Sequence, residues 1–140
     1  MLNKTTIQNI RALVELAQLP KEKCEGAKTI AKRIKAPQNY LAKLLQNLSF
    51  QGLVVSQKGR NGGFRLSKNP SEITLFDIAE STENVDRWKN CVFGLEKCCE
   101  SSPCPLHNRW KNIRESYLEF LQATTLADLL NERKTLNFSI

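Results

Sequence analysis

Apolar residues recur at spacings of three and four positions in three successive stretches, which predicts three helices in the first part of the chain. These stretches cover residues 6–19, about 27–34 and about 38–49. Pro20 ends the first, and Pro37 stands where a proline favours the opening turn of the third. The second and third helices follow each other through a tight turn, as in a helix-turn-helix, whose second helix can enter the major groove of DNA.

A β-hairpin is predicted directly after these helices. Residues 53–57 are rich in β-forming side chains, and residues 64–66 can return as their antiparallel partner. Between them lies a turn in which we expect Gly59, Gly62 and Gly63 to adopt positive φ. A helix-turn-helix followed at once by a hairpin with a basic tip predicts a winged helix.

The second half of the chain has a different organisation. We expect a short helix over 75–80, an irregular segment over 86–104, a long helix from near Pro105 and a last short helix over 126–130. The fold class is therefore mainly α with a small β-hairpin wing, a winged helix-turn-helix plus a long C-terminal dimerisation helix. We divide the chain into a DNA-binding domain at 1–84, a cysteine-rich loop at 85–104 that binds a cluster, and the dimerisation helix with a C-terminal tail at 105–140.

The long helix carries an apolar stripe that needs a partner surface. We expect part of the stripe to pack on the first helix of the same chain and part to meet a second copy across a two-fold axis. The stripe consists of Trp110, Ile113, Tyr117, Phe120 and Leu121.

The charge of the chain is concentrated in its first half. The chain has 140 residues, of which 41% are hydrophobic and 25% charged, and its net charge is +7. That length excludes a nucleotide-binding enzyme with a separate substrate domain. Residues 1–70 carry 13 Lys+Arg against 3 Asp+Glu, whereas residues 71–140 carry 8 against 11. The basic half predicts a polyanionic partner.

The polar face of the third helix and the hairpin tip provide the candidate DNA contacts. Asn39 and Lys43 lie four residues apart on one helix face, where an amide can read adenine and a lysine can reach guanine or phosphate. Arg60 at the hairpin tip is placed to enter a minor groove. The candidate set is Lys28, Gln38, Asn39, Tyr40, Lys43, Lys58, Arg60, Asn61, Gly62 and Arg65; we also expect phosphate contacts from Lys32, Arg33 and Lys35 on the second helix.

No signal-peptide core and no apolar run of membrane-spanning length occurs in the sequence. We therefore expect a cytoplasmic protein with no membrane partner. Disulfides are uncommon in that compartment, and clustered thiols more often bind metal or sense redox state. The adjacent Cys98 and Cys99 lack a thioredoxin-like Cys-x-x-Cys, and no base or substrate pocket is evident, so we expect neither an enzyme nor a small-molecule substrate.

Four cysteines and the single histidine of the chain fall between positions 91 and 107. Three thiolates and an imidazole can hold zinc or an iron–sulfur cluster, and composition does not separate the two. Cys91, Cys98 and Cys104 are separated by six and five residues, and Cys99 in place of Cys98 changes these gaps to seven and four. His107 follows Cys104 by three positions, and it either joins the ligand set or caps the helix start.

The hairpin sequence 58–66, the following stretch 73–78 and the Cys-x6-Cys-x5-Cys-x2-His segment together resemble the Rrf-two family of bacterial winged-helix regulators, which includes the IscR, NsrR and CymR types. The resemblance extends from about residue 1 to residue 130. It implies a homodimeric transcription factor that pairs through its long C-terminal helix.

The same resemblance implies an iron–sulfur cluster held by Cys91, Cys98 and Cys104, with His107 at the place of the fourth ligand of the IscR type. NO-sensing members take an acidic ligand from the first helix of the partner, and residues 5–9 contain no acid here. A 2Fe–2S cluster is therefore favoured over a 4Fe–4S cluster.

The expected function is that of a transcriptional regulator, acting as a repressor. Its affinity for a palindromic double-stranded operator would be controlled by the cluster, which would sense iron–sulfur status or redox and NO stress. The alternative is a winged-helix DNA-binding protein with a structural Cys3His zinc site and no sensing role. Anaerobic purification separates these hypotheses.

Overall fold

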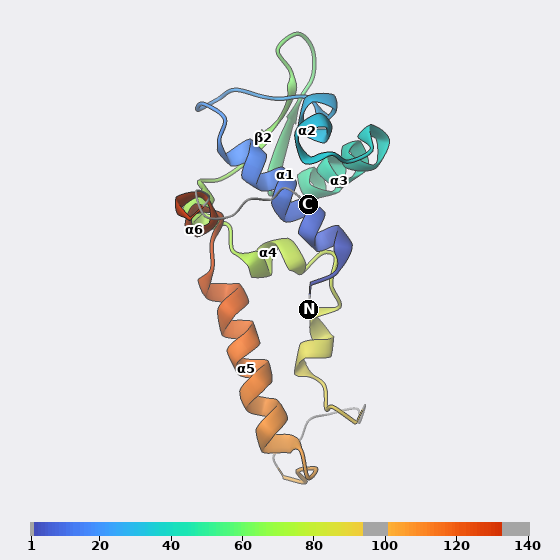
Figure 1. Cartoon of the computed structure of the whole chain (residues 1–140), viewed down its shortest axis with the longest axis vertical. Coiled ribbons are helices and arrows are strands. Elements are labelled where there is room, and N and C mark those ends of the chain that lie inside the picture. The colour runs from blue at the N-terminus through green and yellow to red at the C-terminus, as the bar shows by residue number, and fades with distance from the viewer. Residues whose placement is uncertain (1, 94–100, 133–140) are drawn as a thin grey trace.

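The chain folds into a head of short helices and a two-stranded hairpin, from which one long helix extends (Figure 1). The computed structural model describes residues 2–93 and 101–132. In chain order the elements are α1 (Lys4–Ala17), α2 (Ala27–Ile34), α3 (Gln38–Phe50), β1 (Val54–Gln57), β2 (Gly63–Leu66), the 3₁₀ helix η1 (Pro70–Glu72), α4 (Leu75–Ala79), the 3₁₀ helix η2 (Val85–Lys89), α5 (His107–Ala123) and α6 (Leu126–Asn131). This architecture confirms the fold class expected from the sequence.

Local capping groups set the helix boundaries. Asn3 caps α1, because its Oδ1 accepts a hydrogen bond of 2.8 Å from the backbone N–H of Thr6, and the helix therefore begins earlier than the apolar repeat alone predicts. The long helix α5 begins at His107 rather than near Pro105. The two 3₁₀ helices are too short to be predicted from apolar periodicity.

An isolated β-bridge between Glu25 and Phe64 joins the hairpin to the helix-turn-helix. β1 and β2 pair antiparallel, with Val54 opposite Leu66. On the other edge of β2, the Glu25 N–H donates to the Phe64 carbonyl at 3.0 Å, and the Phe64 N–H donates to the Glu25 carbonyl at 2.8 Å. Since only Gly26 separates Glu25 from α2, these two bonds hold the wing and the helix-turn-helix together.

The C-terminal end of the described chain returns to the head and completes its core. The largest fully buried apolar side chains are Leu13, Ile30, Leu41, Leu45, Leu48, Ile73, Ile78, Leu121 and Leu126. Thr74 and Thr125 form an isolated antiparallel bridge, and the Leu126 N–H donates to the Ile73 carbonyl at 3.0 Å. The head is therefore built from both parts of the chain; the division at 84 and 104 stays a prediction.

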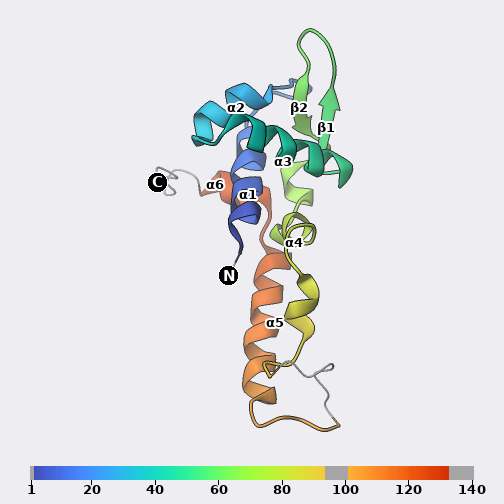
Figure 2. The ribbon, with the colours of Figure 1, turned by 90° about the vertical axis from the view of Figure 1, so that its right-hand side faces the viewer.

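Away from the head, α5 and the segment around η2 lie side by side in both views (Figures 1 and 2). The wing projects from the opposite end of the molecule (Figure 2). The candidate DNA contacts and the cysteine segment therefore lie at opposite ends of the molecule.

Candidate nucleic-acid interface and cysteine site

The helix α3 separates its apolar and polar side chains as a recognition helix requires. Leu41, Leu44, Leu45 and Leu48 are buried in the head. The predicted contact residues of this helix, Gln38, Asn39, Tyr40 and Lys43, are all exposed, and so is Lys28 on α2. These candidates are therefore all accessible, and their contacts with DNA stay a prediction.

Arg33 does not follow the expectation drawn from charge alone. Its Nη1 donates to Glu25 Oε2 at 2.6 Å, its Nη2 donates to Glu25 Oε1, and Glu15 Oε2 lies 3.6 Å from Nη1. Hydrogen bonding to Glu25 raises the pKa of Arg33 above its usual value, against the opposing effect of burial. The guanidinium of Arg33 is thus engaged by two carboxylates of the same chain and links α1 to α2, which argues against the expected phosphate contact.

The tip of the wing presents Lys58, Arg60 and Asn61, and all three are exposed. Asn61 adopts φ of 64°, in the left-handed region that asparagine tolerates. The expectation of positive φ is wrong for Gly62. This position requires glycine for another reason, since a Cβ there would collide with the backbone carbonyl of Gln57.

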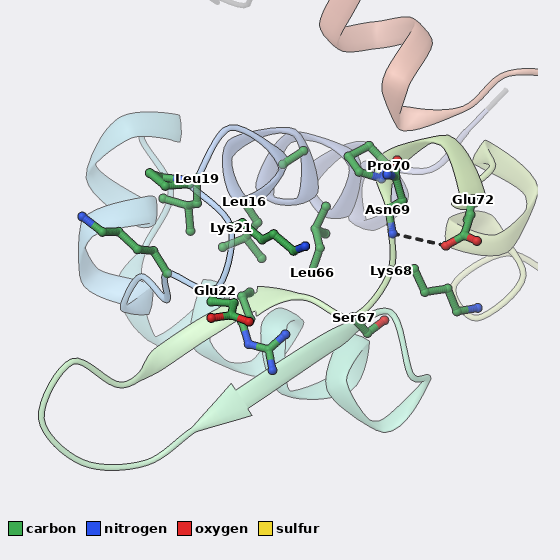
Figure 3. Close-up of a pocket in the computed structure, with 14 residues that line it drawn as sticks. Leu16, Leu19, Lys21, Glu22, Leu66, Ser67, Lys68, Asn69, Pro70 and Glu72 are labelled. Carbon is green, nitrogen blue, oxygen red and sulfur yellow. Dashed lines mark hydrogen bonds between the residues drawn. The ribbon is translucent and has the colours of Figure 1, made fainter.

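Arg65 lies away from the tip, on a hollow of about 600 Å³ between the end of α1 and β2. Figure 3 shows the side chains of Leu16, Leu19, Lys21 and Leu66 among those that line this hollow. Arg65 is half-buried there. The predicted DNA contact of Arg65 would therefore involve a different part of the wing from the contacts of Lys58 and Arg60.

Two of the predicted ligand cysteines meet at the far end of the molecule. The Sγ atoms of Cys91 and Cys104 lie 3.8 Å apart, and the two residues are not joined by a disulfide. Cys91 is 8% exposed, whereas Cys104 is half-buried. Cys98 and Cys99 lie outside the described residues, and within the described ranges no three metal-ligating side chains converge.

The segment that leads into Cys91 runs antiparallel to one face of α5. The ring of Trp88 meets Tyr117 edge-on, with 5.4 Å between the ring centroids. The Lys89 carbonyl accepts a hydrogen bond of 3.1 Å from Arg114 Nη1, and the Asn90 carbonyl accepts one of 2.8 Å from Trp110 Nε1. Each successive residue from 88 to 90 thus contacts a residue three or four positions earlier in α5.

Continued by one residue, this pairing predicts that Cys91 lies opposite His107. His107 is the first residue of α5, is 6% exposed, and donates its backbone N–H to the Cys104 carbonyl at 3.0 Å. Sequence reasoning singled out Cys91, Cys104 and His107 as candidate ligands, which stay a prediction, and it did not identify the contacts of Trp88 and Arg114 with this segment. The signal was present in the spacing, since positions 107, 110, 114 and 117 share one helix face.

The outer side of α5 is apolar and open. Ile113 is 63% exposed and Phe120 is 51% exposed, whereas Leu121 is fully buried in the core of its own chain. Trp110 and Tyr117 are half-buried. A groove of about 920 Å³ runs along this face and is lined by Ile7, Cys91, Val92, Trp110, Ile113 and Phe120 among others. Cys91 therefore borders the predicted dimer surface.

Among the residues that the structure describes, no helix is long and apolar enough to cross a membrane.

Comparison with known proteins identifies the family. The sequence model of the Rrf2 family, described as an iron-dependent transcriptional regulator, matches residues 2–132. The regulator NsrR of Shouchella clausii is 34% identical over 133 residues, which cover 94% of this chain and 89% of that protein. CymR, the global cysteine regulator of B. subtilis, is similar in structure with a TM-score of 0.77 and 28% identity, covering 94% of this chain and 96% of its own.

The T. potens IscR structure is also similar, with a TM-score of 0.73 and 26% identity, covering 100% of this chain and 91% of its own. The match over nearly the whole chain confirms the resemblance drawn from the wing and the cysteine segment. The chain therefore belongs to the Rrf2 family and is a transcriptional regulator rather than an enzyme.

Proposed function

We propose that the chain is a homodimeric cytoplasmic repressor that binds a palindromic operator with an affinity set by an iron–sulfur cluster. The cluster would be held by Cys91, Cys98, Cys104 and His107, and 2Fe–2S is the type that these ligands favour. The single observation that carries this proposal is the approach of two cysteines, 3.8 Å apart, at the start of the helix that bears the predicted dimer surface.

The separation of the two sulfurs suits a shared metal. Two thiolates on one tetrahedral metal, each bonded at about 2.3 Å, stand about 3.8 Å apart. The Sγ atoms of Cys91 and Cys104 have this separation without any rearrangement. A disulfide would require about 2.05 Å. The two thiols therefore fit a metal centre, and the third cysteine would come from positions 98 or 99.

His107 supports the same site from the helix side. Its backbone N–H donates to the Cys104 carbonyl, and the pairing of residues 88–90 with α5, if continued by one residue, would bring it opposite Cys91. His107 is 6% exposed, and a ring nitrogen of histidine is able to ligate a metal. An iron–sulfur cluster, when bound, supplies iron and sulfide that react with oxidants and NO.

The DNA half of the proposal rests on the exposed polar side of α3 and on the wing. Side chains such as Asn39 and Lys43 would meet base edges, and Arg60 would meet the minor groove. In a two-fold dimer the two α3 helices would read half-sites about 10 base pairs apart. Phosphate contacts from Lys28 and Lys58 would make binding weaker at higher salt.

Coupling between the two ends follows from the shared use of α5. The cysteine pair lies at the start of α5, and the end of α5 is anchored in the head by Leu121 and by the Thr74–Thr125 bridge. Changing the ligands around Cys91 would thus change the orientation of α5 relative to the head and to the second copy. Control of affinity requires that the forms with and without the cluster differ in operator binding.

The test is anaerobic purification of the full chain, followed by visible spectroscopy and by assays of iron, zinc and acid-labile sulfide. A coloured protein with acid-labile sulfide is the expected result. DNA selected from a random duplex pool by this protein then serves as the operator, and its affinity is measured with the cluster present and after removal.

Each other outcome contradicts a stated part of the proposal. A colourless protein with one zinc per chain supports the structural Cys3His site. A metal-free protein that still binds its selected DNA supports regulation without a cluster, a possibility that the similarity to the cysteine regulator CymR raises. Equal operator affinity of both forms excludes control by the cluster.

A further inference from the structure

We propose that Trp110 is a positioning residue for the cysteine pair, because its indole N–H holds the peptide unit that carries Cys91. Sequence reasoning placed Trp110 only on the dimer stripe, yet its Nε1 donates to the Asn90 carbonyl at 2.8 Å. The inference rests on the proposed function in one respect, namely that Cys91 and Cys104 belong to one ligand set.

The position of the accepting carbonyl gives this hydrogen bond its effect. The carbonyl of Asn90 and the backbone nitrogen and Cα of Cys91 belong to the same planar peptide unit. A donor that fixes the oxygen at one edge of that plane therefore also fixes the Cα of Cys91. Rotations about the N–Cα and Cα–Cβ bonds of Cys91 then remain to place the sulfur.

Cys104 is tied to the same helix from the other side. Its carbonyl accepts the backbone N–H of His107 at 3.0 Å. In the first turn of α5, the backbone N–H of Trp110 donates to the Leu106 carbonyl at 2.9 Å. Both cysteines are thus held relative to one rigid turn, although 13 positions separate them in sequence. Trp110 supplies the link for Cys91, as the backbone of His107 does for Cys104.

Arg114 provides a weaker form of the same support. Its guanidinium donates to the Lys89 carbonyl at 3.1 Å, one peptide unit further from Cys91. Trp88 is further away again and meets α5 through its ring, against Tyr117. The three side chains therefore form a series in which the effect on Cys91 should decrease from Trp110 through Arg114 to Trp88.

The test measures how well the chain itself holds the two thiols together, without any metal. The full chain carries Cys24→Ser, Cys98→Ser and Cys99→Ser, so that Cys91 and Cys104 are the remaining thiols, and it is kept in a chelator. It is equilibrated with glutathione, where the two thiols and one oxidised glutathione give one protein disulfide and two reduced glutathiones. Mass spectrometry after alkylation gives the effective concentration of the pair.

Trp110→Phe keeps an aromatic ring and removes the N–H donor, and Trp88→Phe is the matched control at the other tryptophan of the chain. We expect Trp110→Phe to lower the effective concentration by about threefold to tenfold, the factor that corresponds to one hydrogen bond. Arg114→Met should lower it less, and Trp88→Phe should leave it unchanged. Circular dichroism and thermal midpoints report the folding of each variant.

An effective concentration that Trp110→Phe leaves unchanged overturns the assignment. An equal decrease in Trp88→Phe also overturns it, because that result describes general loosening of the segment. If Trp110→Phe does not fold, Arg114→Met is compared with Trp88→Phe. A larger decrease in effective concentration for Arg114→Met supports the series, and an equal or smaller decrease overturns it. The experiment needs no metal, so a protein purified without a cluster would contradict the proposed function and leave this inference standing.

Discussion

The backbone of Gly63 lies directly against the backbone of Glu25. A Cβ at Gly63 would stand 2.5 Å from the carbonyl carbon and oxygen of Glu25, and the residue adopts φ of 134°. Gly63→Ala should therefore separate the wing from the segment before α2 and lower the free energy of unfolding by about 2–3 kcal/mol. Urea denaturation measures this loss.

Gly59 offers the matched control in the same turn. It also has positive φ, at 91°, but a Cβ there would meet no atom within 4 Å. Gly59→Ala should cost about 1 kcal/mol, from backbone strain alone. Equal losses in the two variants would show that the contact with Glu25 contributes nothing beyond the strain.

The ion pairs of Arg33 lead to a prediction about salt dependence. Arg60→Ala should weaken binding to duplex DNA and reduce the slope of log affinity against log salt concentration by about 1, because one phosphate contact is lost. Arg33→Ala should leave that slope unchanged, since its guanidinium is held by Glu25 and Glu15. Fluorescence anisotropy over a salt series measures both, and an equal change in slope would return Arg33 to the interface.

The adjacent cysteines can be separated by single substitutions. Cys98→Ser should abolish the visible absorbance and the acid-labile sulfide of the anaerobically purified protein, whereas Cys99→Ser should retain both. Serine is nearly isosteric with cysteine but is a poor ligand for soft metals. The reverse result would assign the third ligand to Cys99 and change the ligand gaps to seven and four.

Phe120 tests the predicted dimer surface. Phe120→Glu places a charge on the apolar face of α5 and should shift the protein from dimer to monomer in analytical ultracentrifugation. Phe50→Glu is the control, because Phe50 is 85% exposed at the end of α3, outside the α5 groove. Dissociation by Phe50→Glu alone would place the interface on the head.

Tyr117 carries an unusual hydroxyl. Within the part of the chain that the structure describes, this buried oxygen has no hydrogen-bond partner. Tyr117→Phe should therefore raise the free energy of unfolding, by about 1 kcal/mol, because an unsatisfied polar atom is removed. Thermal denaturation at neutral pH measures the gain, and a loss of stability would mean that the hydroxyl is bonded in solution.

The same residue gives a prediction at alkaline pH. Burial, and then the charge of Glu83, raises the pKa of Tyr117 above its usual value of 10.0. The folded chain thus keeps a proton that the unfolded chain loses, so stability falls as the pH rises from 10 upward. Tyr117→Phe should lack this part of the decline, measured as the difference between the two proteins in urea denaturation from pH 9 to 11.

Apolar periodicity predicted the helices because it records which side of each helix is buried. It does not record which element covers that side, so the return of Leu126 to the core had no local signal. Charge counting assigned Arg33 to DNA because a sequence does not show that Glu15 and Glu25 lie beside it. Gly62 was recognised as a turn residue, but its reason is a close contact rather than its φ.

The sequence likewise predicted the local features of the cysteine site but not its contacts between distant segments. Clustering in sequence identified the ligand candidates, and the helix start near Pro105 placed Cys104 and His107 together. The contacts of Arg114 and Trp110 with the carbonyls of Lys89 and Asn90 depend on how two segments lie beside each other. This pairing exists only in the folded chain. The spacing of residues along α5 indicated its helix side but not the segment that packs against it.

The bridge between Thr74 and Thr125 makes α5 a lever with a fixed fulcrum. The helix has 17 residues, and its far end carries the cysteine pair. At 1.5 Å per residue the lever arm is about 25 Å, so a tilt of about 5° at the fulcrum corresponds to about 2 Å at the far end. Under the proposed function, small displacements of the thiols would change the angle of α5 at the head, and two such helices joined along their length would set the span between two DNA-binding heads.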